Sequence, residues 1–409
     1  MMPLGWRLRR ATIRRRTIVA TFAAALALAI TLSAPAASTP EAPGGGDGTA
    51  TELNGEIVLG ATFPLSGSLE MYGQSAYYGA VTRIRMINES GGVNGKRLVL
   101  EWRDNRSDPS QAIRDVEELV RTHKVPAILG PLLSDATMAV GDMAKRLGVV
   151  IMTPMATMDA ANRHNPWIFR ACFSNSAQAE GLIAFQINSY GAQRCGILYD
   201  PRHDVSLELA EIFEKRFIEQ GGKVVGSLPM VDANGAVNPD EALGALVAKK
   251  PDFLFVPCYA LEAIEIVQAV KRLGIVTRLC GSDTWDNELV FDGSGSRLAG
   301  TAFSSALFEQ GLNYRPFQTF FTAMEQAGMD NPDAQAACAY DAVTLLATAL
   351  KMGETPEAIR KGLVVRRLPL ATGRITITKD GETRKQVLVR IIERKNDRLV
   401  PVFASRYDP

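Results

Sequence analysis

Short apolar runs alternate with amphipathic segments along most of this chain. The runs have the length of buried strands, and the segments between them carry apolar residues at helical spacing. Because strands and helices alternate, the pattern predicts parallel sheets covered by helices, and therefore an α/β fold. The predicted strands are residues 56–60, 97–102, 125–130, 149–152, 194–199, 223–227, 252–257 and 278–280, and the clearest helices are 134–147, 205–220 and 261–273.

The end of the chain follows a different pattern. Residues 374–378 and 386–392 are separated by Lys379-Asp380-Gly381, which predicts an antiparallel hairpin. The chain of 409 residues is too long for one small domain, and the part after the leader described next suits two lobes of ordinary size.

The first residues have the features of a secretory signal peptide. A basic segment (7–16) precedes an uncharged apolar run (17–32) and a small-residue cleavage pattern (34–37). The run is somewhat short of the ~20 residues that a spanning helix needs, so residues 1–37 are predicted to be cleaved rather than to form an anchor. Residues 38–54 are rich in Pro, Gly and Ala near their start and are predicted to form a flexible leader. We therefore expect a periplasmic protein, exported by either the Sec or the twin-arginine route.

Cysteine usage supports a freely diffusing protein. The first cysteine is Cys172, so no cysteine near the cleavage site can carry a lipid. The five cysteines are scattered along the sequence, and most are expected to be buried free thiols, although spacing alone cannot decide which of them pair.

Charge and motif content exclude several classes of function. Without the six arginines of residues 1–37, the 45 basic residues fall to 39 against 44 acidic residues, a net charge of −5, so nucleic acid is not an expected partner. The three histidines show no metal-binding spacing, and no G-x-S-x-G motif is present. The segment Gly91 to Lys96 is one residue short of a P-loop, with Arg97 where Ser or Thr would bind magnesium. We predict a protein that is not an enzyme and needs no metal or cofactor.

The N-terminal part of the fold carries a more specific signal. Strand 56–60 leads into Phe63-Pro64-Leu65-Ser66-Gly67, a helix ends at residues 87–89, and the turn 91–95 precedes a strand that runs into Asp104 and Asp108-Pro109. This order resembles the opening of the periplasmic amino-acid-binding proteins of the leucine/isoleucine/valine-binding type. The resemblance implies the type I periplasmic binding protein fold, in which two Rossmann-like lobes with parallel sheets are joined by three crossover segments. With crossings near Phe173, Ala302 and Val365, lobe I would be residues 55–173 plus 303–365, and lobe II would be 174–302 plus 366–409.

Ligands of open α/β sheets bind beyond the carboxyl ends of the strands, where helix N-termini present free N–H groups. Ser134 begins a helix after strand 125–130, so its hydroxyl suits a ligand carboxylate, although an ordinary helix-capping serine has the same pattern. The resemblance implies that Ala156 offers its carbonyl to a ligand ammonium, and that Thr157 offers its hydroxyl and N–H.

The second lobe would supply the opposite wall. By the resemblance, Tyr259 closes over the ligand and Asp283 binds its α-ammonium group. Trp285 and Tyr72 are candidate aromatic walls, and core packing is an equal alternative for both. Asp204 stands near the position where branched-chain members carry a tyrosine, and with Arg202 it favours a polar or charged ligand. Ser107 and Leu133 occupy the positions of the family's first-lobe disulfide. The contacts to the amino and carboxylate groups of an α-amino acid are therefore expected to be retained, while selectivity for the ligand side chain stays open.

The expected partners are a small-molecule ligand, most simply an amino acid, and an inner-membrane ABC permease, with the protein itself a monomer. The alternative is a ligand-sensing module that binds an amide or a small carboxylate and feeds a regulator. Sensors of this fold usually carry a further transmembrane or effector segment, and this sequence ends at Pro409 soon after the predicted hairpin, which favours transport.

Overall fold

The computed structural model describes residues 53–292, 298–307, 313–396 and 398–409. The predicted signal peptide (1–37) and all but the last two residues of the predicted leader (38–54) lie outside this part of the chain. Within the described ranges, no helix combines the length and the apolar character needed to cross a membrane.

Within the described residues, the first sheet has five strands, all parallel, in the order β2-β1-β3-β4-β5. The inner strands β3 and β4 consist only of buried residues because helices cover both faces, which explains their continuous apolar sequence. The strands are β1 (Glu56–Phe63), β2 (Arg97–Asp104), β3 (Ala127–Leu129), β4 (Val150–Thr153) and β5 (Ile168–Arg170).

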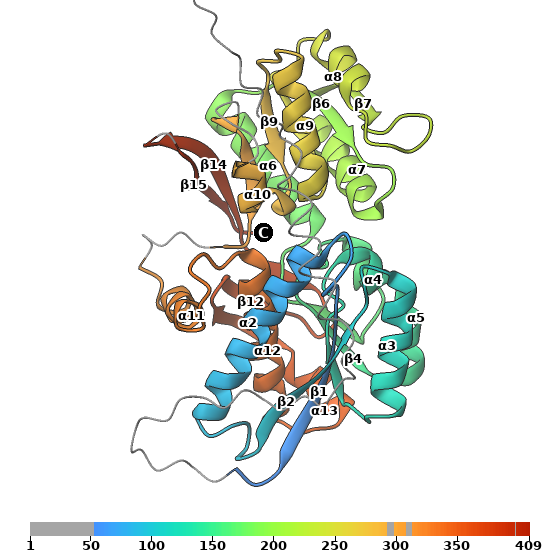
Figure 1. Ribbon diagram of the computed structural model, residues 1–409, viewed down its shortest axis with the longest axis vertical. Coiled ribbons are helices and arrows are strands. Elements are labelled where there is room, and N and C mark those ends of the chain that lie inside the picture. The colour runs from blue at the N-terminus through green and yellow to red at the C-terminus, as the bar shows by residue number, and fades with distance from the viewer. Residues whose placement is uncertain (1–52, 293–297, 308–312, 397) are drawn as a thin grey trace, which may run out of the picture. The chain divides into compact units, whose positions relative to one another are not determined.

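Helices from two distant parts of the sequence cover this sheet. Helix α2 packs along α12, which comes more than 240 residues later in the chain (Figure 1). The two backbones approach closely at Gly79, where a Cβ atom would lie 2.1 Å from the carbonyl oxygen of Ala336. Only glycine therefore fits at this crossing. The helices are α2 (Glu70–Glu89), α3 (Pro109–Arg121), α4 (Ser134–Ala139), α5 (Gly141–Leu147), the 3₁₀ helix η1 (Asp159–Ala161), α11 (Arg315–Gln326), α12 (Ala334–Leu350) and α13 (Pro356–Gly362).

The second sheet has seven strands over the residues that the structure describes, in the order β15-β14-β10-β9-β8-β6-β7. Strands β6 to β10 run parallel, whereas β14 is antiparallel to both β10 and β15. The strands are β6 (Arg194–Tyr199), β7 (Lys223–Pro229), β8 (Phe253–Val256), β9 (Arg278–Gly281), β10 (Ala302–Ser305), β14 (Val387–Lys395) and β15 (Arg398–Tyr407). The helices of this region are α6 (Asn175–Tyr190), α7 (Asp204–Glu219), α8 (Asp240–Val247), α9 (Ala260–Arg272), the 3₁₀ helix η2 (Asp283–Trp285) and α10 (Glu288–Asp292).

A third, small antiparallel sheet in the range 313–396 revises the predicted hairpin. Strand β12 (Gly373–Ile377) pairs with β11 (Val365–Leu370) and with β13 (Thr383–Lys385). The hairpin turn therefore exists, but its second arm ends at Lys385. From Val387 the chain enters the second sheet as β14, whose first four residues are all buried, as an inner strand requires.

The points where the chain changes sheets differ in detail from the expected crossings. The first change falls between β5 and α6, at residues 171–174, around the expected Phe173. Strand β10 still pairs with β9, so the second sheet extends to Ser305, beyond the expected crossing at Ala302. The third return to the second sheet begins at Val387 rather than near Val365, because the third sheet intervenes.

All five cysteines lie in the described ranges and are buried and free, as expected for most of them. The thiols lie in the apolar interior, and burial raises the pKa of Cys172 and of Cys280 to about 12.

Candidate functional site

A pocket lies at the carboxyl ends of parallel strands from both large sheets. Two groups of lining residues follow β3 and β4 of the first sheet, and three groups follow β6, β8 and β9 of the second. This is the position at which open α/β sheets bind ligands. The lining residues are Leu133, Ser134, Met155, Thr157, His203, Val205, Ser206, Leu209, Pro257, Cys258, Tyr259, Ser282, Asp283 and Thr284.

The structure brings four of the eight sequence-predicted site residues into this lining, namely Ser134, Thr157, Tyr259 and Asp283. The other four, Tyr72, Ala156, Asp204 and Trp285, lie outside it.

A buried arginine binds the loop after β4, which forms part of the first-sheet wall of the pocket. Arg170, at the end of β5, donates through Nη1 to the carbonyl oxygens of Ala156 (3.2 Å) and Thr157 (2.9 Å). Its other nitrogen, Nη2, binds Asn162, and burial lowers the pKa of the guanidinium. The carbonyl that the resemblance assigned to a ligand ammonium is thus directed at Arg170. Thr157 keeps its place in the pocket lining.

Ser134 is the first residue of α4 and also lines the first-sheet wall of the pocket. Its hydroxyl accepts a hydrogen bond from the backbone N–H of Met158 at 3.2 Å, which ties the loop after β3 to the loop after β4. The predicted helix 134–147 is two short helices, α4 and α5, that meet at Val140.

Asp283 supplies a buried carboxylate on the second-sheet wall. It begins η2 directly after β9, is only 4% exposed, and burial raises its pKa to about 6. The groups that oppose this shift are the backbone of Asp283 itself and the side chain of Gln178, both hydrogen-bonding groups rather than cations. A buried carboxylate without a cationic partner is costly when ionised, so this group favours a cationic ligand.

Two tyrosines meet beside the pocket, and their roles differ. Tyr259 lines the pocket as the residue before α9, and its ring centroid lies 5.9 Å from that of Tyr72. Tyr72 lies on α2, and its hydroxyl accepts a hydrogen bond from the N–H of Ala260 at 2.8 Å. The same hydroxyl lies 3.5 Å from the carbonyl oxygen of Thr284. Tyr72 therefore connects a first-sheet helix to the second-sheet ligand loops and does not form a ligand wall.

Trp285 and Asp204 also differ from their expected places. Trp285 is fully buried and packs over Gly281, where a Cβ atom would lie 2.3 Å from the indole ring, so it is a core residue. Asp204 is the exposed first residue of α7, and the neighbouring His203 faces the pocket in its place.

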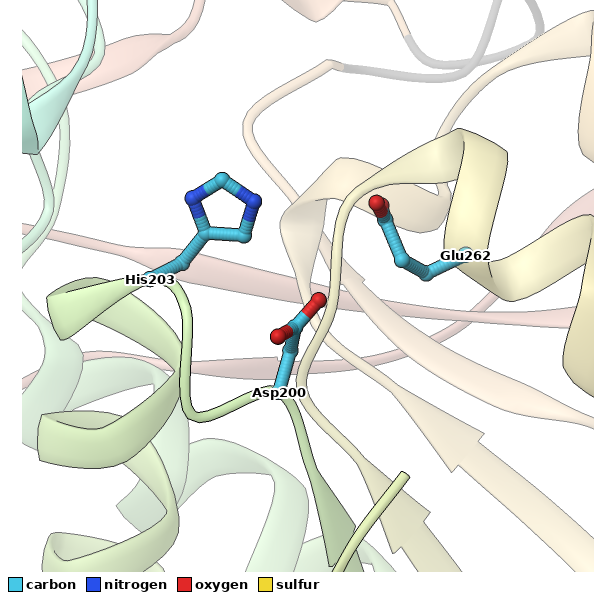
Figure 2. A group of neighbouring side chains, drawn as sticks. All are labelled: Asp200, His203 and Glu262. Carbon is cyan, nitrogen blue, oxygen red and sulfur yellow. The ribbon is translucent and has the colours of Figure 1, made fainter. Parts of the chain in front are cut away.

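His203 lies among three carboxylates. Its Nδ1 is 3.5 Å from Asp135 of α4, and its ring packs edge-on against Tyr259 at 4.9 Å. Asp200 and Glu262 also lie near His203, with atoms of the three side chains within 4.8 Å of one another (Figure 2). Burial lowers the pKa of His203, but the hydrogen bond to Asp135 and the charges of the three carboxylates outweigh it, and the net effect raises the pKa.

The two carboxylates of the cluster of Asp200, His203 and Glu262 are both bound by a neighbouring arginine. Arg202 donates through Nη2 to Asp200 at 2.6 Å and to Glu262 at 3.0 Å. This guanidinium supplies positive charge between the two carboxylates, and it holds the pKa of Asp200 below its usual value against the opposing effect of burial. The arrangement is an ion-pair network at the edge of the pocket and does not require a metal ion. The guanidinium of Arg202 is therefore already paired with two carboxylates of the protein, those of Asp200 and Glu262.

His203 lies one position before the predicted Asp204, and nothing in the sequence marks Arg170 or Gln178 as part of the site. His203 follows β6 in the same way as Ser134 follows β3, so the strand-end rule could have found it. Arg170 and Gln178 act through contacts with other segments, and nothing in their local sequence marks them.

Comparisons with known proteins agree with this geometry. The family described as periplasmic binding protein matches residues 56–395. The Leu/Ile/Val-binding protein BraC3 of Rhizobium johnstonii is 26% identical over 345 residues, covering 81% of this chain and 90% of the relative.

Solved structures of similar proteins extend the comparison. The branched-chain amino acid transporter substrate-binding protein LivJ of Streptococcus pneumoniae, solved in complex with isoleucine, is 26% identical, with a TM-score of 0.77, covering 85% of this chain and all of that one. A solute-binding protein of an ABC transporter from Rhodopseudomonas palustris, in complex with 3,4-dihydroxybenzoic acid, has the same TM-score at 18% identity, covering 86% of this chain and 97% of that one, and shares the fold alone.

The family model spans most of the chain, and both the α/β architecture and the strand-end pocket fit it. Members of this family bind solutes, which confirms the prediction of a binding protein rather than an enzyme. The chain belongs to the periplasmic binding proteins, in the type I group that includes the Leu/Ile/Val-binding proteins.

Proposed function

We propose that this protein is the substrate receptor of an ABC importer and that it binds an α-amino acid in the pocket described above. The observation that carries the proposal is that one pocket contains both groups that suit a carboxylate and a group that suits an ammonium ion. Ser134 and Thr157 offer hydroxyl groups at strand ends of the first sheet, which suit a carboxylate, and Asp283 offers a buried carboxylate from the second sheet, which suits an ammonium group.

The ligand side chain is proposed to be apolar. Much of the remaining lining is apolar, with Leu133, Met155, Val205, Leu209 and Pro257. Asp204 and Arg202 left a polar or differently charged ligand open as an alternative. Asp204 is exposed, and Arg202 is bound to Asp200 and Glu262, so neither residue supports that alternative. The names of the relatives fit an apolar side chain, since BraC3 is named for Leu, Ile and Val and the LivJ structure contains isoleucine.

We propose that binding works by closure of two lobes. Lobe I comprises the first and third sheets with their helices, and lobe II comprises the second sheet with its helices. A ligand that contacts Ser134 and Thr157 on one lobe and Asp283 and Tyr259 on the other stabilises the closed arrangement, because it gains both sets of contacts only there. An ABC permease can then recognise the closed receptor.

The proposal is tested by thermal-shift screening of the purified protein against amino acids, short amides and small carboxylates, followed by calorimetry. The expected result is that aliphatic α-amino acids raise the melting temperature most. A best ligand without an amino group, such as an aromatic carboxylate, would contradict the role given to Asp283.

We also propose delivery to the periplasm by a cleaved signal peptide, with the protein acting as a monomer. The family supports a periplasmic location, and the basic, apolar and small-residue segments of residues 1–37 support cleavage. Intact mass and N-terminal sequencing of protein from a periplasmic extract should give a chain that begins near Ala37. Recovery in the detergent-solubilised membrane fraction alone would contradict cleavage, and a dimeric mass by light scattering would contradict the monomer.

A further inference from the structure

Gln178 lies in the interior where segments from three parts of the chain meet. It is fully buried on α6, soon after the first crossover. Its Oε1 accepts hydrogen bonds from the hydroxyl of Ser304 (2.8 Å), near the end of β10, and from the backbone N–H of Asp283 (3.4 Å). Its Nε2 donates to the side chain of Asn175 at 2.8 Å. Both ends of the amide are therefore in use, which fixes its orientation.

Gln178 also acts on the carboxyl group of Asp283. Burial raises the pKa of that carboxyl, and the side-chain hydrogen bond from Gln178 works in the opposite direction. A donor that lowers this pKa favours the ionised form, which is the form that pairs with a ligand ammonium. No cation is among the groups that act on this carboxyl in the described part of the chain.

The same network reaches the first-sheet wall. The backbone N–H of Asn175 donates to the carbonyl of Thr157 at 2.7 Å, and its side chain donates to Glu208 at 2.7 Å. Glu208 in turn accepts from the N–H groups of Asp159 (2.9 Å) and Ala160 (3.2 Å), which follow Thr157 after Met158. A continuous chain of hydrogen bonds thus connects Asp283 to the loop of Thr157 through Gln178 and Asn175.

We infer that Gln178 is the positioning residue for amine recognition: it holds the backbone of Asp283 in place and registers it against the loop of Thr157. The inference rests on the proposed function, since it assumes a ligand with an amino group. Gln178 does not line the pocket, so it acts through Asp283 and not by touching the ligand.

The test compares Gln178→Met with Gln186→Met. Methionine keeps the length of glutamine and its unbranched shape but cannot make the hydrogen bonds. Gln186 is the matched control because it lies on the same helix, is also buried, and is outside the pocket lining. By calorimetry with the best amino acid from the screen, Gln178→Met should bind about tenfold more weakly, as expected for loss of a hydrogen bond to a charged group. Gln186→Met should bind like the parent protein.

Two further readouts separate positioning from a general loss of structure. The pH at which amino-acid affinity falls should move upward in Gln178→Met, because the carboxyl of Asp283 loses the donor that favours its ionised form. In an Asp283→Asn background, the same Gln178→Met change should have almost no further effect. An equal loss of affinity in both backgrounds, or an unshifted pH profile, would overturn the inference.

A milder variant covers the case in which Gln178→Met folds poorly. Ser304→Ala removes the hydroxyl that donates to Gln178 and should give a smaller loss of affinity that also disappears in the Asp283→Asn background. If Asp283→Asn itself leaves amino-acid affinity unchanged, the proposed function is wrong at that residue. If Asp283→Asn weakens binding while Gln178→Met and Ser304→Ala do not, only the inference about Gln178 is wrong.

Discussion

The hydroxyl of Tyr72 accepts a hydrogen bond from the backbone N–H of Ala260 at 2.8 Å, although 188 positions separate the two residues. Tyr72 belongs to a helix that covers the first sheet, and Ala260 is the first residue of a helix that follows β8 of the second. The first N–H groups of a helix have no partner within the helix, so this hydroxyl satisfies one of them from the other side of the pocket. Such a contact exists only when the loops of both sheets are together.

Replacing Tyr72 with phenylalanine should therefore weaken ligand binding. The change keeps the ring that packs near Tyr259 but removes the acceptor for the N–H of Ala260, a hydrogen bond worth about 0.5–1.5 kcal/mol to closure, together with the longer contact to the carbonyl of Thr284. We expect the dissociation constant to rise by about two- to tenfold in calorimetry. Tyr77→Phe, a half-buried tyrosine on the same helix, is the control and should change little. Equal effects of the two variants would show that the hydroxyl of Tyr72 has no special role.

Asp283→Asn should weaken binding of an amino acid at least tenfold. Removing one partner of a buried charge pair costs roughly 2–5 kcal/mol, since the other charge is left unpaired, and 1.4 kcal/mol corresponds to about one decade. The variant should bind a ligand without the amino group about as well as the parent does. Calorimetry on both proteins with a matched pair of ligands checks this, and an unchanged affinity for the amino acid would remove Asp283 from the site.

Amino-acid affinity of the unaltered protein should also fall as the pH drops through about 6. Burial raises the pKa of Asp283 to about 6 in the ligand-free protein, so below that pH the carboxyl is protonated and must lose its proton before it can pair with an ammonium. Affinity is therefore highest above pH 6. Titrations between pH 5 and pH 8 should show a decline on the acidic side that is absent in Asp283→Asn.

The pair formed by His203 and Asp135 should make closure dependent on pH in the opposite sense. The pKa of His203 is raised, so the contribution of the pair is fully present below the ordinary value of 6.5 and is lost as the pH rises through the raised value. Because both side chains are partly exposed, the contribution should be below about 1 kcal/mol and should shrink in high salt. His203→Gln and Asp135→Asn should each lower affinity more at pH 6 than at pH 9. A loss that does not vary with pH would contradict this role.

A buried lysine should contribute strongly to stability near the third sheet. Lys385 is fully buried, donates to the carbonyl of Ala171 at 2.6 Å, and lies 3.9 Å from the carboxylate of Asp341. Lys385→Met leaves Asp341 without its cation, which typically costs about 3–5 kcal/mol. Urea denaturation should show this loss, whereas the exposed Lys379→Met should change the unfolding free energy by less than about 0.5 kcal/mol. Similar stabilities of the two variants would contradict the assignment.

Four residues that the sequence singled out lie in the pocket lining, and their signals depend on local order along the chain. Ser134 and Thr157 follow strands whose apolar character is plain, and the resemblance pointed to Tyr259 and Asp283. Trp285 and Tyr72 were ambiguous because an aromatic residue near a strand end suits a ligand wall and a core equally well. Only the three-dimensional contacts place Trp285 over Gly281 and the hydroxyl of Tyr72 on Ala260.

Other parts of the site could not be predicted because they depend on distant segments. Gln178 acquires its role from Ser304, 126 positions later, and no local pattern records that meeting. Similarly, a sequence that reads as one hairpin near the end of the chain is divided between two sheets. That division depends on the pairing of β14 with β10, which lies more than 80 residues earlier.

The five free cysteines set a condition on how long this protein lasts. The thiolate is the reactive form of cysteine, and burial keeps the pKa of Cys172 and Cys280 at about 12, so the folded protein presents almost no nucleophile to an oxidant. In an oxidising compartment, a molecule that unfolds exposes all five thiols together, and mispaired crosslinks would then make the unfolding irreversible. The working lifetime is therefore determined by the rate of unfolding and not by the chemical reactivity of the native thiols.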